Sequence, residues 1–290
     1  MGTEEVLVCD GGPASGSVRL YREQGYLVAP ALLSPAEVAE LKQETALIFR
    51  GGRGPVDGLL QAVTGLTDAQ VLEKYLAIHF PHKISPVVRR YLSHPRVVEV
   101  LTQLVGPNVK CMQSMLFVKG PGKAGQAWHQ DEYYIPTRDR SLIGAWIAID
   151  AATLQNGCLS VIPGSHRAGV IHRRIAGVSA EFAESDTVDV TEYSNEQQVP
   201  IEVESGSVVF FNGYLLHSSR RNRTSDCFRM ALVNHYMSAE SLLPWDLDHT
   251  LAPTEDLRDI TLVAGVDPYA WKGLVDVSKP FLRAETRKPG

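Results

Sequence analysis

The sequence predicts a mainly β protein with flanking helices, in which a double-sheet jelly roll forms the core. Apolar residues recur at helical spacing in the first third of the chain. From Val109 onward, the pattern changes to short runs of β-branched and aromatic residues with turns between them. About eight such runs follow, which is typical of a jelly roll. These observations predict a helical front of about residues 34–106 and a jelly-roll core of about residues 109–237.

The elements before the core have clear start signals. Residues 1–17 are rich in glycine and serine and are expected to be flexible, and the apolar run of residues 26–33 is expected to be a strand. Ser34-Pro35-Ala36-Glu37 then has the form of a helical capping box, with proline at the first helical position. Helices, each beginning at a capping residue or a proline, are expected over residues 35–50, 67–77 and 95–105.

The strands of the core are separated by glycine, proline and polar residues, which favour turns. Strands are expected over residues 109–118, 127–135, 143–150, 158–162, 200–204, 207–212, 214–218 and 227–237. Residues 167–199 contain few core signals and are interpreted as a long insertion near the mouth of the predicted site. The tail from Ser241 onward is expected to be loop. Residues 18–290 should therefore form a single domain, with residues 238–290 as a C-terminal extension.

Composition limits the classes of function. The chain has 290 residues, of which 44% are hydrophobic, and its net charge of −5 argues against a general nucleic-acid binder. No apolar run approaches the ~20 residues that a membrane span needs. The four cysteines have no zinc-site spacing, and no secretory signal is evident, so free thiols and a cytoplasmic location are expected. These cysteines are Cys9, Cys111, Cys158 and Cys227.

The most informative motif is His129-Gln130-Asp131, followed later in the chain by His217. On a β-strand, residues i and i+2 point to the same face, so His129 and Asp131 can present an imidazole and a carboxylate side by side. A second imidazole from His217 would complete a facial triad of two histidines and one carboxylate. Such a triad binds Fe(II) and leaves positions open for a keto acid and O2. The motif therefore predicts a non-haem iron oxygenase.

Arg229 lies on the next strand-like run, from which it can reach back into the same pocket. Its planar guanidinium matches a carboxylate with two hydrogen bonds. In 2-oxoglutarate, iron would hold the C1 carboxylate and the keto oxygen, while a cation must hold the distal C5 carboxylate. Arg229 is the expected cation.

The chain resembles the phytanoyl-CoA dioxygenase family of Fe(II)/2-oxoglutarate oxygenases. The matching segments occur in family order over roughly residues 20–240, and they are QSMLFVKGPG, WHQDEYY, GAWIAIDAATLQNGCLSVIPGSH, GSVVFFNGYLLHSS and NRTSDCFRMAL. The stretch GCLSVIPGSH is the most diagnostic. The resemblance implies a double-stranded β-helix of the cupin-like kind as the core.

Residue by residue, the resemblance implies two sets of site residues. His129, Asp131 and His217 become the iron ligands, and Arg229 becomes the partner of the C5 carboxylate. A second set falls where the family lines its keto-acid pocket: Gln113, Met115, Gln130, Trp146 and Ser219. Because Gln130 alternates away from the metal ligands on a strand, its contact with the keto acid requires a local twist. Lys83 is the candidate for an upstream family lysine.

Other polar residues have two readings. His79, His82 and Lys83 belong either to a solvated loop or to the pocket edge, and His166 is interpreted as a structural residue of its turn. Two basic runs are either solvated or hold an anionic substrate; they are His172-Arg173-Arg174 and Arg220-Arg221-Asn222-Arg223. The 167–199 segment is predicted to be a lid that orders over the pocket when substrate binds.

Three functions stay open at this point. The first is an Fe(II)/2-oxoglutarate-dependent dioxygenase that hydroxylates a small organic substrate and releases succinate and CO2. The second keeps Fe(II), 2-oxoglutarate and O2 but leads to desaturation, cyclisation or epimerisation. The third is a non-catalytic jelly-roll binding protein, which the complete triad and Arg229 disfavour. The sequence predicts a small-molecule substrate and no nucleic-acid or membrane partner, and it does not indicate the oligomeric state.

Overall fold

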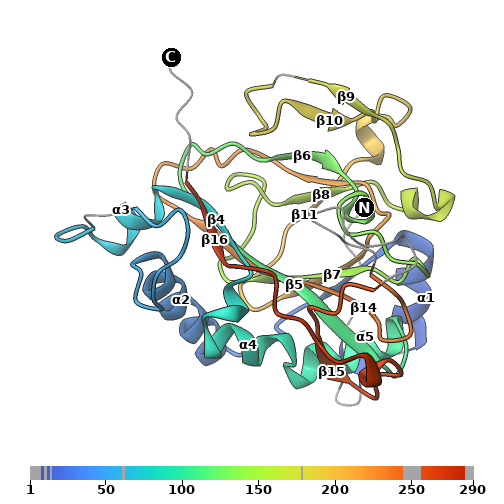
Figure 1. Cartoon of the computed structure of the whole chain (residues 1–290). Coiled ribbons are helices and arrows are strands. Elements are labelled where there is room, and N and C mark those ends of the chain that lie inside the picture. The colour runs from blue at the N-terminus through green and yellow to red at the C-terminus, as the bar shows by residue number, and fades with distance from the viewer. Residues whose placement is uncertain are drawn as a thin grey trace.

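Two antiparallel sheets packed face to face form the centre of the molecule (Figure 1). The computed structural model describes residues 8–9, 12–13, 15–60, 63–177, 179–243 and 256–284. The larger sheet has the order β16-β4-β5-β14-β7-β12-β3, with β15 also paired to β5. Its strands are Phe281–Ala284, Tyr75–His79, Val109–Lys119, Arg229–Ser238, Ile143–Ala148, Val208–Asn212 and Tyr26–Ala29, and β15 is Thr261–Ala264.

The smaller sheet has the order β11-β8-β13-β6 and lies above the larger one in Figure 1. Its strands are Val199–Ile201, Leu159–Val161, His217–Ser219 and Gln126–His129. The two sheets do not close into a barrel. This arrangement confirms the predicted fold class, a mainly β protein with a jelly-roll core and flanking helices.

The central strands of the larger sheet are buried on both faces, and successive residues serve two different cores. On β7, Ala145 and Ile147 pack in the core beneath the sheet, while Trp146 and Ala148 pack against the smaller sheet. This alternation follows from the two-residue period of a strand. The inner core between the sheets forms the floor of the candidate site.

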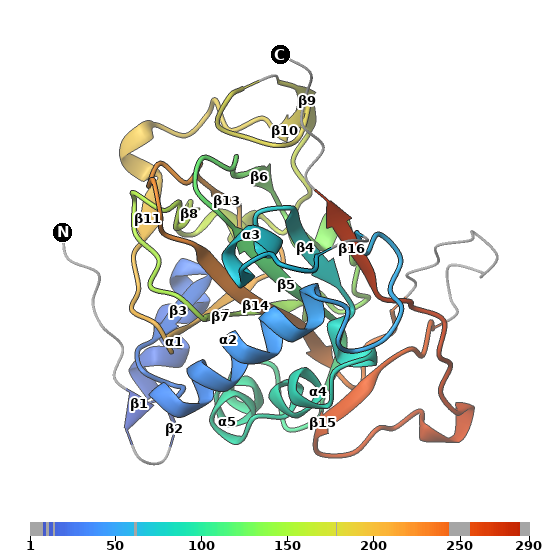
Figure 2. The same ribbon diagram turned by 90° about the vertical axis from the view of Figure 1, so that its left-hand side faces the viewer.

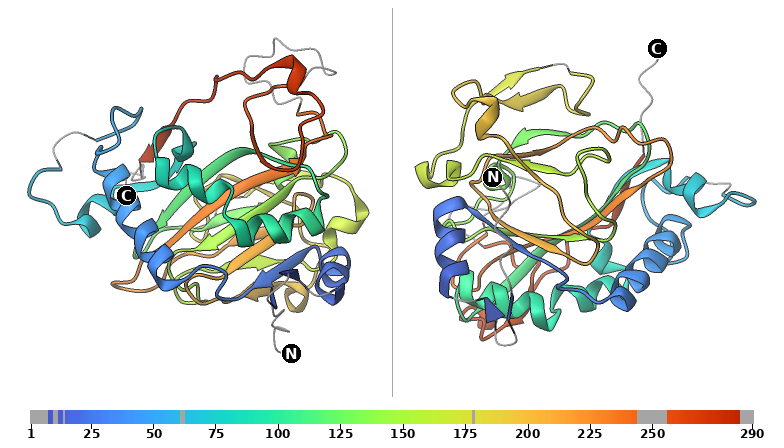
Figure 3. Two further views of the ribbon diagram at one scale, coloured as in Figure 1. Left: turned by 90° about the horizontal axis from the view of Figure 1, so that it is seen from below. Right: turned by 180° about the vertical axis from the view of Figure 1, so that it is seen from behind.

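Helices cover the outer face of the larger sheet, as Figures 2 and 3 show from three further directions. They are α1 (Ser15–Gln24), α2 (Pro35–Phe49), α3 (Asp68–Leu72), α4 (Pro86–Leu92) and α5 (Pro95–Leu104). The capping box at the start of α2 is confirmed, since Ser34 Oγ accepts from Glu37 N and the Glu37 carboxylate accepts from Ser34 N. Leu41, Ile48 and Phe49 of α2 are buried in the outer core.

Several boundaries differ from the sequence expectation. The helix expected over residues 67–77 ends at Leu72, because Tyr75–His79 pairs with both β5 and β16 as strand β4. Pairing with two strands outweighs the weak helical signal of this stretch. Helix α1 begins at Ser15, inside the segment expected to be flexible; residues 1–7, 10, 11 and 14 lie outside the described residues.

The C-terminal tail is not the simple loop that was expected. β15 and β16 both add to the larger sheet, and a 3-10 turn, η5 (Ala270–Lys272), lies between them. Pro244 and Pro253, two of the prolines in this tail, lie outside the described residues.

The 167–199 insertion contains a short hairpin, β9 (Arg174–Ala176) paired with β10 (Asp186–Val188). The hairpin lies over β6, on the outer side of the smaller sheet (Figure 1).

Among the described residues, no helix is long and apolar enough to cross a membrane. Cys111, Cys158 and Cys227 are free cysteines, as expected.

Candidate metal centre and its pocket

His129, Asp131 and His217 come together as a compact cluster on the inner side of the smaller sheet. One ligand atom from each residue lies within 4.8 Å of the other two. Asp131 Oδ1 is 3.7 Å from His129 Nε2 and 3.7 Å from His217 Nε2. All three side chains are buried. Two imidazoles and one carboxylate converging in this way match the donor set of a facial triad for Fe(II).

The two histidines are neighbours across a strand pair, since His217 of β13 lies directly opposite His129 of β6. Asp131, however, is not on the strand that the sequence predicted over residues 127–135. β6 ends at His129, and Asp131 begins the 3-10 turn η2 (Asp131–Tyr133). A hydrogen bond from Glu132 N to Gly213 O, at 3.0 Å, holds this turn against the end of β12. The carboxylate is therefore placed by a turn rather than by strand alternation.

Backbone carbonyls orient both imidazoles. His129 Nδ1 is 2.7 Å from Ala127 O, and His217 Nδ1 is 3.0 Å from Leu215 O. Because a carbonyl can only accept, each Nδ1 carries a hydrogen, and in the neutral imidazole Nε2 is then the nitrogen with the lone pair. Both Nε2 atoms face Asp131. A hydrogen bond to the far ring nitrogen is the usual way in which proteins fix a metal-binding histidine.

His235, which the sequence analysis missed, completes the surroundings of the carboxylate. Its Nε2 is 3.1 Å from Asp131 Oδ2, the oxygen opposite the one that faces the two histidines. The signal for it was present, because His235 is on β14 at an even spacing from Arg229. Residues at even spacing on a strand share a face, and Arg229, Val233 and His235 all line the pocket.

The protonation states suit a metal centre. Burial, with a smaller contribution from His217, lowers the pKa of His129 to about 3. For Asp131, burial raises the pKa, but His217 and His235 outweigh it and hold the pKa below its ordinary value. At neutral pH, His129 is a neutral imidazole and Asp131 is a carboxylate, the forms that bind metal.

Arg229 reaches the same pocket from the start of β14. It is 3% exposed, and its guanidinium carbon lies 5.4 Å from the centre of the Trp146 ring. Burial lowers the pKa of Arg229 to about 10. Its Nε is buried without a hydrogen-bond partner among the described residues. A buried guanidinium with an unused donor fits a site that binds a carboxylate from outside the chain.

A second cation, Lys119, was also missed by the sequence analysis. It lies opposite Arg229 on the neighbouring strand β5 and lines the pocket. Its ammonium donates to Ser219 Oγ at 2.9 Å, to Arg220 O at 2.6 Å and to Gly157 O at 3.2 Å. Burial, followed by the nearby Arg229 charge, lowers the pKa of Lys119 well below its ordinary value. Lys119 therefore fixes Ser219 at the end of the pocket that holds Arg229.

The predicted pocket residues divide into two groups. Met115, Trp146 and Ser219 line the pocket together with the triad and Arg229. Gln113 and Gln130 are not among the described residues that line it. The amide of Gln130 instead donates to Val170 O at 3.0 Å and to Tyr214 O at 2.7 Å, and it accepts from His172 N at 2.8 Å. Gln130 thus ties the start of the 167–199 segment to the sheet.

The upstream polar cluster lies outside the pocket lining. Lys83 forms ion pairs with Asp259 and, at 2.7 Å, with Asp276. The ring of His79 stacks on Phe281 with centroids 4.2 Å apart, and His82 Nδ1 is 2.6 Å from Ser114 Oγ. These residues hold the C-terminal extension and strand β5 in place.

His166 bonds the carbonyl of Arg22 at 3.1 Å, as a structural residue of its turn would.

The two basic runs are largely occupied by contacts within the chain. Arg174 pairs with Asp186 at 2.7 Å across the β9–β10 hairpin. Arg221 donates to Ala180 O at 2.7 Å, and Arg223 pairs with Glu181. The 167–199 segment reaches the pocket through Ala183 and Glu184, and Glu184 also accepts from Ala127 N at 2.9 Å.

Comparison with known proteins agrees with this site. A family model described as Phytanoyl-CoA dioxygenase (PhyH) matches residues 21–231. Phytanoyl-CoA dioxygenase domain-containing protein 1 of Danio rerio is 28% identical over 278 residues, covering 83% of this chain and 95% of the relative. Peroxisomal phytanoyl-CoA dioxygenase of Homo sapiens is 28% identical over 234 residues, covering 77% of this chain and 68% of the relative.

Solved structures share the architecture. The non-haem α-ketoglutarate-dependent carbocyclase SnoK from nogalamycin biosynthesis aligns with a TM-score of 0.64 at 25% identity, covering 87% of this chain and 96% of SnoK. EctD from S. alaskensis, solved with 2-oxoglutarate and 5-hydroxyectoine, shares the fold with a TM-score of 0.61 at 24% identity, covering 82% of each chain. Because the family model spans most of the sequence, this chain belongs to the phytanoyl-CoA dioxygenase (PhyH) family.

Proposed function

We propose that this protein hydroxylates a small organic substrate at the pocket formed by the triad and Arg229, with release of succinate and CO2. Its class and cofactors follow from the family: it is an oxidoreductase that uses Fe(II), 2-oxoglutarate and O2. The observation that carries the proposal is the convergence of His129, Asp131 and His217 on one side of a pocket whose other end holds Arg229.

The residues present fit both groups. His129 Nε2, His217 Nε2 and Asp131 Oδ1 would hold the iron, since these atoms lie close together and each Nδ1 is engaged by a backbone carbonyl. Arg229 would hold the distal carboxylate of 2-oxoglutarate, with Ser219 beside it. Bound Fe(II) supplies the chemistry that activates O2 and couples it to decarboxylation of the keto acid.

The protein's own residues hold the binding groups in position and exclude water from the site. His235 holds the second oxygen of Asp131, so that Oδ1 stays directed at the two imidazoles. The Trp146 ring lies beside the Arg229 guanidinium and limits its movement. The aromatic and aliphatic side chains of Phe117, Phe211 and Val233 line the remaining wall and exclude water from the reacting centre.

A different outcome at the same site is the second candidate. SnoK, which shares the fold at 25% identity, is named a carbocyclase. Hydroxylation, cyclisation, desaturation and epimerisation can all use one set of metal ligands, so the choice depends on how the substrate lies above the iron. Mass spectrometry recognises hydroxylation, which adds one oxygen atom, and distinguishes it from cyclisation and desaturation, which each remove two hydrogens. Because epimerisation leaves the mass unchanged, and because cyclisation and desaturation change it equally, NMR of the product separates these outcomes.

The test of the proposed function is succinate formation. Protein loaded with Fe(II) under anaerobic conditions is mixed with 2-oxoglutarate, a panel of small organic compounds and O2, and succinate is measured. Substrate-stimulated succinate in the wild type, abolished in His217→Ala, supports the proposal. A protein that binds one iron and 2-oxoglutarate but gives no succinate with or without any compound would instead be a binding protein.

A cytoplasmic location stays a prediction, and the human relative is named as peroxisomal.

A further inference from the structure

The C-terminal extension supplies one wall of the pocket. Residues 256–284 lie beyond the part of the chain that the family model matches, which ends at residue 231. Their last strand, β16, forms the edge of the larger sheet beside β4, as Figure 2 shows. Arg283 of β16 lines the same pocket as the triad, and Leu76 of β4 lies in that lining as well. This chain therefore brings a residue to its pocket from outside the matched region.

Strand geometry aims Arg283 at the pocket. Leu282 lies opposite Ile78, and both are buried in the outer core beneath the sheet. Arg283, one residue later, lies opposite Ala77, which in turn lies opposite Phe117 of β5. Residues directly opposite on neighbouring strands share a face, and Phe117 lines the pocket. Arg283 therefore shares the face of the sheet that holds the metal centre.

β16 is held on both sides. Besides its pairing with β4, Leu282 N donates to Asp57 O at 2.8 Å. Gly58 makes this approach possible, since a Cβ there would lie 2.3 Å from Leu282 O. The stack of Phe281 on His79 and the ion pair of Lys83 with Asp276 fix the strand and the segment before it.

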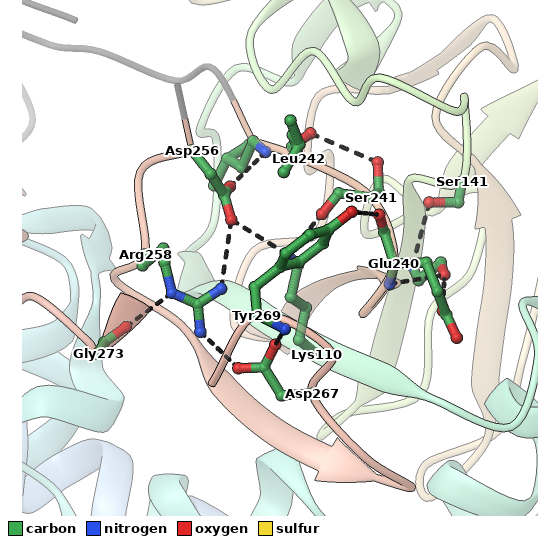
Figure 4. A network of polar contacts seen from close by, with 12 residues as sticks. Lys110, Ser141, Glu240, Ser241, Leu242, Asp256, Arg258, Asp267, Tyr269 and Gly273 are labelled. Atoms are coloured by element: carbon green, nitrogen blue, oxygen red, sulfur yellow. Dashed lines mark hydrogen bonds and ion pairs between the residues drawn. The ribbon is translucent and has the colours of Figure 1, made fainter. Parts of the chain in front are cut away.

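A buried polar network anchors the extension farther from the pocket (Figure 4). The Arg258 guanidinium lies between Asp256 and Asp267, and its Nε donates to Gly273 O at 2.7 Å. Lys110 of β5, which is fully buried, lies 3.7 Å from Asp256 and donates to Ser241 O at 2.6 Å. A segment fixed by buried ion pairs can hold a recognition residue in one place.

The Arg283 guanidinium is available to bind a ligand. Among the described residues, no carboxylate forms an ion pair with it. The pocket's other cations have their own tasks: Lys119 bonds Ser219 and two carbonyls, and Arg229 faces the predicted keto-acid end. Glu184, the carboxylate that the 167–199 segment brings to the pocket, already accepts a hydrogen bond from Ala127 N. Arg283 is thus an exposed guanidinium on the wall of a pocket whose catalytic positions belong to other residues.

We propose that Arg283 binds a carboxylate of the substrate, and that the C-terminal strand β16 is a specificity element of this enzyme. The proposal rests on the proposed function, because it assumes that substrate occupies the pocket above the metal centre. A planar guanidinium pairs with a carboxylate through two parallel hydrogen bonds, which sets the orientation of the substrate as well as its affinity. The enzyme's substrates would then be small organic acids rather than neutral molecules.

The experiment compares acids with their amides. Protein is loaded with Ni(II) in place of iron and with saturating 2-oxoglutarate, so that Arg229 is occupied and no turnover occurs. A library of small carboxylic acids, each paired with its primary amide, is then screened by ligand-observed NMR. The variants are Arg283→Gln, Arg283→Lys and, as a matched control, Lys279→Gln, which removes an exposed positive charge from the same extension without touching the pocket lining.

In the wild type, acids are expected to bind and their amides to bind more weakly. Arg283→Gln should weaken the acids by about 10- to 100-fold and leave the amides unchanged, since one charged hydrogen-bonding group is lost. Arg283→Lys should recover part of the difference, and Lys279→Gln should match the wild type. Equal binding of acids and amides in the wild type, no acid-selective ligand at all, or full acid binding by Arg283→Gln would each overturn the proposal.

Failure of the proposed function is recognised separately. Ni(II) and 2-oxoglutarate affinities are measured first in every variant, and thermal unfolding confirms that each is folded. If the wild type binds neither, the proposed function fails. The acid–amide screen is then repeated on metal-free Arg229→Ala protein, in which acid binding by Arg283 can still be tested. Normal 2-oxoglutarate binding in Arg283→Gln together with lost acid binding would separate the specificity role from cofactor binding.

Discussion

His235 Nε2 and Asp131 Oδ2 lie 3.1 Å apart, on the side of the carboxylate that faces away from the two histidines of the triad. This contact joins β14, which also carries Arg229, to the turn that carries the predicted metal-binding carboxylate. One strand therefore carries the predicted 2-oxoglutarate cation, Arg229, and also fixes the carboxylate of the predicted metal site through His235. The geometry of the metal centre is expected to depend on His235 although it does not point at the metal position.

Replacing His235 by alanine should lower Fe(II) affinity by about 10- to 100-fold, since partners of metal-binding carboxylates have effects of this size. His235→Gln should recover part of the affinity, because its amide can donate to Asp131. Metal titration measures both. His79→Gln is the matched control, a histidine of strand β4 in the same sheet that is absent from the pocket lining. Equal affinity in His235→Ala and the wild type would limit this histidine to a packing role.

Arg229→Ala should weaken 2-oxoglutarate far more than iron. Loss of a buried bidentate charge pair costs roughly 2–5 kcal/mol, or about 30- to several-thousand-fold in affinity. Arg229→Lys should recover only part, since an ammonium cannot reproduce the fork of the guanidinium. Calorimetric titration of 2-oxoglutarate measures the change, with the exposed Arg220→Ala as the control. An unaltered dissociation constant in Arg229→Ala would transfer the role to another cation, with Lys119 the first to test.

Gln130→Ala should loosen the 167–199 segment without emptying the metal site. The variant loses the hydrogen bonds of Gln130 to Val170 O, Tyr214 O and His172 N. Limited proteolysis is expected to cut within residues 170–199 faster in the variant, while iron affinity stays within about threefold of the wild type. The lid prediction adds that 2-oxoglutarate and a binding substrate slow this cleavage in the wild type. The same cleavage rate in free and loaded protein would make the segment an ordinary surface loop.

The pH dependence of the free energy of unfolding at acid pH should reflect the cap of helix α2. Burial raises the pKa of Glu37, but hydrogen bonds from His94 and Ser34 outweigh it and lower the pKa to about 2. A carboxyl whose pKa is lowered in the folded state stabilises the fold at pH values above its unfolded pKa. That contribution is lost as the pH falls from about 4.5 toward 2.

Glu37→Gln should therefore lower the free energy of unfolding at pH 7 by about 1 kcal/mol, the usual size of a capping interaction. The difference from the wild type should shrink as the pH approaches 2.5. Urea unfolding at several pH values measures it. A difference that is constant from pH 7 to pH 2.5 would show that the charge of Glu37 has no part in the cap.

Strong local signals in the sequence predicted much of this architecture. Helix α2 begins at the capping box of Ser34, and helix α5 begins at its proline, as expected. The long apolar strands β5 and β14 also form where they were expected. Strands of marginal signal were missed. β16 depends on pairing with β4, and β4 depends on pairing with β5, which is a tertiary effect that local propensity does not contain.

The site shows the same division. His129, Asp131, His217 and Arg229 could be found from their spacing and the family motifs, although Asp131 reaches its place through a turn. His235 and Lys119 are single polar residues in apolar strands, and only the sheet register brings them beside Asp131 and Arg229. Gln130 stands between two predicted metal ligands in sequence, yet its amide points to the other side and binds the backbone of the 167–199 segment and of Tyr214.

The most direct test of the central claim is an anaerobic titration of the protein with Fe(II) and 2-oxoglutarate, followed by visible absorption. A keto acid bound through its carboxylate and keto oxygen to Fe(II) gives a charge-transfer band, so the band reports both groups in one site. The account predicts a band that saturates at one Fe(II) per chain, needs 2-oxoglutarate, is absent in Asp131→Ala, and requires a much higher 2-oxoglutarate concentration in Arg229→Ala. No band in the wild type, or an unchanged titration in both variants, would contradict it.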